Sequence, residues 1–126
     1  MNTYLIIAGV LTALMALVHS VLGERMILLP LPRREDGPGR GGLSRGMRST
    51  LRFTWHLTSV LGGGIAALFF HYGRMDALAA DQAAVLTILA ITFLISFLVA
   101  LVGSRGRHPS WAVFLIVALL VWIGAR

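Results

Sequence analysis

Long blocks of apolar residues, separated by short polar segments, constrain this chain more than any other feature of its sequence. Several blocks reach roughly the 18–20 residues that a helix needs to cross a bilayer. Hydrophobic residues make up 57% of the 126 residues, and only 13% of the residues are charged. Because a typical soluble domain has about a quarter charged residues, these charges are too few to cover a soluble globule. We therefore exclude a soluble enzyme, a disordered tail and a nucleic-acid-binding domain.

The apolar blocks predict four membrane spans, at about residues 4–22, 53–72, 83–103 and 111–125. A backbone in lipid must satisfy its own hydrogen bonds, and the alternation typical of barrel strands is missing, so each span is expected to be a helix. The predicted fold class is all-α: one integral membrane domain, residues 1–126, folded as an antiparallel four-helix bundle. The fourth span is almost entirely apolar, so we expect it to be the most exposed to lipid.

Arginine is distributed unevenly between the predicted loops. All 11 Lys and Arg positions are arginine, and most of them fall in a basic loop at about residues 25–52. Because arginine-rich loops stay in the cytoplasm, this loop is predicted to be cytoplasmic and both termini to lie outside. Exclusive use of arginine is typical of a GC-rich genome, and a bacterial inner membrane is the expected location. Anionic lipid headgroups are the expected partners of this loop.

Proline and glycine interrupt the basic loop, at Pro30, Pro32 and the run of residues 37–42. This composition is incompatible with regular structure in the middle of the loop. We interpret the loop as a flexible connector that touches lipid and sets the topology. A docking segment for a partner is the alternative.

Small residues follow one face of the first span, at Ala8, Thr12, Ala16 and Ser20. The second span carries three consecutive glycines, residues 62–64. Because small residues let helices approach closely in lipid, we expect both groups to pack helix against helix. A hinge is the alternative for the glycines.

Ionisable residues near the ends of the first two spans gather at one predicted depth. His19 and Glu24 end the first span, while Arg52 and His56 open the second. A charged group costs about 2.5–3.5 kcal/mol at the centre of a span, and ionisable residues within spans are often functional. The predicted topology places all four at the cytoplasmic boundary, where His108 of the third loop would lie on the same side.

Three chemical interpretations fit this cluster, and the residues alone leave all three open. In the first, it binds a cofactor: haem held by His19 and His56, or a divalent metal held by His19, Glu24 and His56. In the second, it handles protons or anions, with Glu24 held by Arg52. The chain has no cysteine, which excludes Cys-ligated zinc and iron–sulfur clusters.

The third interpretation is structural. Glu24 pairs with Arg52, and the two histidines hydrogen-bond to the supporting residues Ser20 and Ser59, which locks the first two helices together. Groups at an interface need no further function, because long side chains reach water from there.

Three functional hypotheses follow from these observations. The first is a non-enzymatic accessory or structural subunit that associates with a membrane protein partner or with itself; the scarcity of polar groups within the spans favours it. The second is a haem- or metal-binding membrane redox protein that uses His19 and His56. The third is a small proton-coupled transporter.

Overall fold

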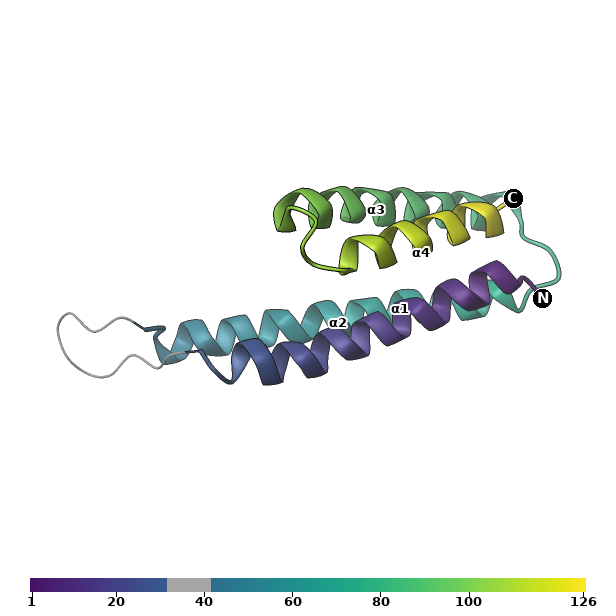
Figure 1. Cartoon of the computed structure of the whole chain (residues 1–126). Coiled ribbons are helices and arrows are strands. Elements are labelled where there is room, and N and C mark those ends of the chain that lie inside the picture. The colour runs from purple at the N-terminus through teal and green to yellow at the C-terminus, as the bar shows by residue number, and fades with distance from the viewer. Residues whose placement is uncertain (32–41) are drawn as a thin grey trace.

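A computed structural model describes residues 1–31 and 42–126 of the chain. Its helices are, in chain order, α1 (Thr3–Leu22), the π-helix η1 (Gly23–Leu28), α2 (Arg45–Gly73), α3 (Ala80–Ser104) and α4 (Ser110–Gly124). Successive α-helices run antiparallel (Figure 1), and the described residues form no β-strand. The predicted all-α class with four helices is confirmed.

Three helical segments are long and apolar enough to cross a membrane: Thr3–Leu28, Arg45–Gly73 and Ala80–Ser104. The fourth helix, α4, is also apolar but has only 15 residues. Three of the four spans predicted from the sequence therefore correspond to helices that are long and apolar enough to cross a membrane, and the fourth corresponds to a shorter apolar helix.

The predicted basic loop is more helical at its ends than its sequence indicated. The first helix continues without a break into η1, which ends at Leu28, and α2 already begins at Arg45. The Ser44 side chain caps α2 by accepting a hydrogen bond from the Met47 backbone N–H, at 3.3 Å. Pro32 and residues 37–41 of the glycine-rich run lie outside the described residues.

The four helices form two hairpins, α1–α2 and α3–α4, which pack on each other through α1 and α4 (Figure 1). Asn2 ties the ends of three helices together. Its Nδ2 donates to the carbonyl of Gly124 at 2.8 Å, and its backbone N–H donates to the carbonyl of Gly73 at 2.7 Å. The two termini therefore lie at the same end of the bundle.

Glycines on both helices bring α1 and α2 into close contact. A Cβ on Gly9 would approach the Phe70 ring to 2.9 Å, and a Cβ on Gly73 would approach Ile6 Cδ1 to 2.8 Å. At the next level along the hairpin, a Cβ on Gly62 would lie 3.2 Å from that of Ala16. The small face of α1 and Gly62 of α2 thus pack as predicted, since the missing side chains leave room for the facing helix. The same prediction is wrong for Gly63 and Gly64, because a Cβ on either would meet nothing within 4 Å.

The apolar core sits at the end of the bundle that carries the termini. Its buried members come from all four helices: Leu5, Ala8, Phe69, Leu86, Ala90, Phe93, Val117, Ala118 and Val121. The ring of Phe69 on α2 lies 5.9 Å from that of Phe93 on α3, centroid to centroid. This end of the bundle is therefore the part in which all four helices meet.

The prediction that the fourth helix is the most lipid-exposed is wrong. Helix α4 packs against both α1 and α3, and it buries Val117, Ala118, Val121 and Gly124. A Cβ on Gly124 would lie only 2.8 Å from the side chain of Leu5 on α1. Small and β-branched residues on one side of α4 leave room for the neighbouring helix. The overall apolarity of α4, on which the prediction rested, does not show this difference between its sides.

Large apolar side chains cover the outside of the bundle. Leu17 on α1 is 60% exposed, Val60 on α2 is 69% exposed and Val102 on α3 is 74% exposed. Soluble proteins rarely expose apolar surface of this extent. Together with the length and apolarity of three helices, this surface suggests a membrane protein.

We predict that Phe69→Ala destabilises the bundle, because the cavity left behind removes packing contacts between α2 and α3. The expected loss is about 3 kcal/mol, at the lower end of the range for a buried Phe, since lipid removes the water-transfer contribution. Unfolding by SDS in mixed micelles measures it. Phe53→Ala on the same helix is the control, since Phe53 is 64% exposed; equal losses in both variants would contradict the packing described here.

Candidate functional site

The junction of α1 and η1 contacts the first half of α2 through an indole ring. The Trp55 ring lies against Gly23, and any Cβ on Gly23 would overlap it. Trp55 Nε1 donates a hydrogen bond to the backbone carbonyl of His19 at 2.9 Å. Position 23 therefore requires glycine, because a side chain there would block the close approach of α2. Gly23 is also the first residue of the π-helix, and π-helical turns are frequent at functional sites.

The imidazole of His19 stacks flat on the same indole ring. The two ring centroids are 4.4 Å apart and the planes differ by 1°. His19 Nε2 lies 3.2 Å from Thr58 Oγ1, and this hydroxyl donates to the carbonyl of Trp55 at 2.7 Å. Because the hydroxyl has one hydrogen, it accepts the second bond from His19 Nε2–H. His19 is thus held by its ring face and by one edge.

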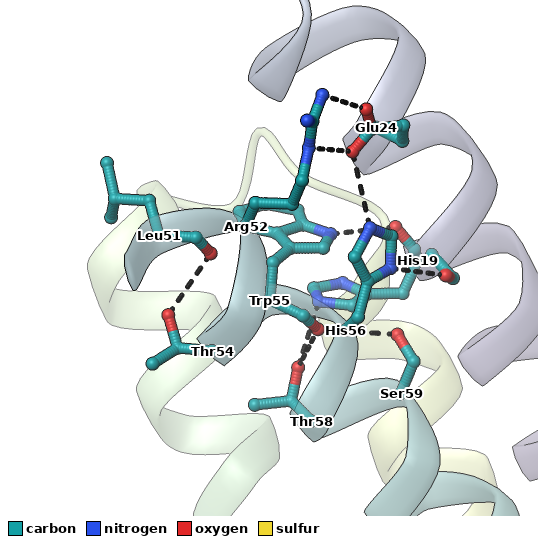
Figure 2. Close-up of polar contacts among 10 residues, drawn as sticks. His19, Glu24, Leu51, Arg52, Thr54, Trp55, His56, Thr58 and Ser59 are labelled. Atoms are coloured by element: carbon teal, nitrogen blue, oxygen red, sulfur yellow. Dashed lines mark hydrogen bonds and ion pairs between the residues drawn. The ribbon is translucent and has the colours of Figure 1, made fainter. Parts of the chain in front are cut away.

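A chain of four polar side chains connects η1, α1 and α2 beside this stack (Figure 2). Ser20 Oγ lies 2.8 Å from His56 Nδ1, and His56 Nε2 lies 3.2 Å from Glu24 Oε2. Arg52 binds the Glu24 carboxylate with two nitrogens: Nε contacts Oε2 at 3.1 Å, and a terminal nitrogen contacts Oε1. The order of the chain is therefore Ser20, His56, Glu24 and Arg52.

The charged end of the chain sets the direction of its hydrogen bonds. A carboxylate held by a guanidinium in this two-point geometry is ionised and only accepts. His56 must therefore donate from Nε2 to Glu24. When the imidazole is neutral, Nδ1 is then an acceptor and Ser20 donates its hydroxyl hydrogen to His56.

The structure brings together five of the six residues that the sequence proposed for the site: His19, Ser20, Glu24, Arg52 and His56. Ser59 departs from the prediction, because its Oγ donates to the Trp55 carbonyl at 3.5 Å and contacts no histidine. Thr58 binds His19 instead. His108 hydrogen-bonds to Ser110 Oγ at 2.8 Å within its own segment.

Sequence analysis missed three residues of the site, Gly23, Trp55 and Thr58. Trp55 lies between Arg52 and His56 in the sequence, and its aromatic character alone is typical of any membrane interface. Thr58 follows Trp55 by three residues, the spacing of neighbours on a helix face. Only the position of α1 decides that Thr58, and not Ser59, contacts His19.

The cofactor hypotheses find no support in this arrangement. His56 uses both ring nitrogens within the chain, so in this geometry it offers none to a haem iron or a metal ion. Among residues 1–31 and 42–126, no group of three or more His, Cys, Asp or Glu side chains is placed to hold a metal ion. The haem site of His19 and His56, and the metal set that adds Glu24, stay predictions.

Comparison with family models, with curated proteins and with solved structures found no match to this chain. Its function is therefore inferred from its own residues.

We predict that Gly23→Ala separates α1 from α2 at the candidate site, because the added methyl group occupies the place of the indole ring. The expected destabilisation is about 1–3 kcal/mol, the range for overpacking, together with a changed tryptophan emission spectrum. Gly103→Ala is the control, since a Cβ there meets nothing within 4 Å. An unchanged spectrum and stability in Gly23→Ala would contradict the Trp55 contact.

Proposed function

We propose that this protein is a small multi-pass membrane protein that serves as an accessory or structural subunit of a membrane complex. The proposed location is a bacterial inner membrane, with both termini outside. The observation that carries the proposal is the outward apolar surface of the bundle, which exceeds what the chain buries by itself.

The share of each apolar segment that is buried within the chain is small. It is 28% for the first candidate span, 11% for the second and 17% for the third. Lipid tails cover such surfaces, but they provide no specific contact. A membrane protein partner would use the same surface for packing, since close packing drives helix association in lipid.

Helix α2 has the surface best suited to such a partner. It has the least buried span, and its outward face carries Val60 and Leu61, which are 69% and 60% exposed. Gly63 and Gly64 are on the outside as well, since a Cβ on either would meet nothing within 4 Å. Glycines at outward positions allow a second helix to approach the backbone closely.

The hydrogen bonds of Glu24 favour a subunit role over proton-coupled transport. Both carboxylate oxygens of Glu24 are engaged, by Arg52 and by His56, and these contacts tie η1 to α2. A transporter needs a carboxylate that exchanges partners during its cycle. A fixed ion pair between two helices supports a rigid bundle instead.

Arginines at the same end of the bundle supply the proposed lipid contact. Arg25, Arg45 and Arg52 are exposed, and each basic residue near an anionic membrane surface contributes about 1 kcal/mol to the attraction. Anionic headgroups are therefore the proposed partners of this end, which faces the cytoplasm in the proposed orientation.

A photo-reactive amino acid placed on α2 tests the subunit proposal. We expect residue 60 to form a discrete protein adduct in native membranes, because a partner helix covers that face. Position 99 on α3 is the matched control, since Val99 is 68% exposed and is also a valine. Adducts with lipid alone at both positions would contradict the proposal.

Reporter fusions after Arg126 test the proposed orientation. Alkaline phosphatase fused there should be active, because it folds only outside the cytoplasm, while a green fluorescent protein exported through the same pathway should stay dark. Fluorescence combined with inactive phosphatase would place the C-terminus in the cytoplasm and overturn the orientation.

A further inference from the structure

We propose that Ser20 is the nucleophile of an acyl-transfer site that acts on acyl esters of membrane lipids. His56 is its general base, and Glu24 is the positioning residue that orients His56. This activity goes beyond a subunit role, and the chain of contacts from Ser20 to Arg52 carries it.

The geometry matches the requirement for an activated serine. Such a serine needs a base within about 2.6–3.2 Å, and the base needs a third group that orients it. The Ser20 Oγ–His56 Nδ1 distance is 2.8 Å, and the His56 Nε2–Glu24 Oε2 distance is 3.2 Å. In the Ser-His-Asp triad the two ring nitrogens have the opposite assignment. Either nitrogen of imidazole accepts a proton, so the roles hold after this exchange.

The hydroxyl of Ser20 differs from those of several other helical serines and threonines in the described chain. Thr58 and Ser110 also contact a histidine ring nitrogen, and Ser110 does so within its own segment, at the start of α4. Within helices these hydroxyls commonly donate to the carbonyl four residues earlier. This bond is made by Thr12, Thr87, Thr92, Ser96 and Ser104. The hydroxyl of Ser20 instead points to His56 on the facing helix. Its proton is therefore directed to a base rather than to the backbone.

Arg52 keeps Glu24 available for its orienting role. The guanidinium contacts both carboxylate oxygens (Figure 2), and Oε2 accepts from both Arg52 Nε and His56 Nε2. An ionised carboxylate in this place fixes the tautomer of His56 that leaves Nδ1 free to take a proton.

The position of the site along the helices indicates the substrate class. Ser20 and His56 are partly exposed and lie where the most apolar part of the α1–α2 hairpin ends. Towards the arginine-rich end lie Glu24, four residues after Ser20 in η1, and Arg52, four residues before His56 in α2. In the proposed orientation this level corresponds to the interface between hydrocarbon and headgroups, where the ester carbonyls of phospholipids lie. Lipid esters can reach such a site laterally.

The proposed reaction is an ester hydrolysis in two steps. Ser20 Oγ attacks the ester carbonyl carbon while its proton moves to His56 Nδ1. The C–O bond to the lipid alcohol breaks, and the alcohol leaves with this proton, so an acyl-serine forms. Water then attacks the acyl-serine, gives a proton to Nδ1, and Ser20 Oγ recovers that proton as the carboxylic acid leaves. The sum is ester plus water giving alcohol plus acid.

Reaction with a long-chain fluorophosphonate tests the nucleophile. We expect the full-length protein in nanodiscs to acquire one phosphonyl group, located on Ser20 by peptide mass spectrometry. Ser20→Ala should lose the label. His56→Phe should react at least about a hundredfold more slowly, which is the smallest effect expected for loss of a general base. Ser96→Ala is the control that should react like the wild type.

Folding is followed in every variant by far-UV circular dichroism and by tryptophan emission, and Glu24→Gln provides a second, milder variant. It keeps the size of the side chain but loses the charge that orients His56, so labelling should slow while helicity is unchanged. The proposal is overturned if a folded wild type remains unlabelled under conditions that label a known serine hydrolase, or if Ser20→Ala labels equally.

Release of fatty acid from phosphatidylglycerol vesicles tests the substrate. We expect release by the wild type and none by Ser20→Ala. Labelling of Ser20 without release would overturn the lipid ester as substrate while the nucleophile stands. Neither result depends on a partner covering α2, so this proposal and the subunit proposal fail separately.

Discussion

The close contact between α1 and α2 positions every other feature of this molecule. Glycines lie at successive levels of the hairpin, with Gly73 opposite Ile6, Gly62 opposite Ala16 and Gly23 opposite Trp55. Each missing side chain lets the facing helix approach, and together they fix the register of the two helices. This register places Ser20 opposite His56 and Glu24 opposite Arg52. Without it, the same side chains would be separate polar groups on two apolar helices.

The polar chain and the apolar surface suit the same apolar environment. In apolar surroundings an unpaired polar group is costly, so the polar side chains of the site are bonded to one another across the helices. The outside is left to large aliphatic residues. A hydrogen-bonded chain of this kind both stabilises the helix pair and aligns a serine, a histidine and a carboxylate. Its structural role and the proposed chemical role therefore need the same geometry and do not compete.

Much of the candidate site was predictable from the sequence because of helical periodicity. Ser20 and Glu24 are four residues apart, as are Arg52 and His56, so each pair had to share a helix face. The antiparallel order of helices joined in sequence places both pairs at one level, while the glycine contacts between α1 and α2 decide that the two faces meet. Ser20 was correctly predicted as a histidine partner, but the partner of His19 was not predictable, since Thr58 and Ser59 are adjacent and a small rotation of α2 decides between them. The role of α4 was missed for a similar reason, because overall apolarity does not show which side is small enough to admit α1.

The sequence by itself determined that the chain forms apolar helices, where they lie, and which ionisable residues fall at one level of the first helix pair. These properties depend on the length of apolar runs and on the period of a helix, both of which are local. Only the tertiary structure decided that Trp55 covers Gly23, that α4 joins the two hairpins, and that the hydroxyl of Ser20 is directed to His56 rather than to its own backbone. These properties depend on how two helix surfaces fit together, and a single helix holds no information about the shape of its neighbour.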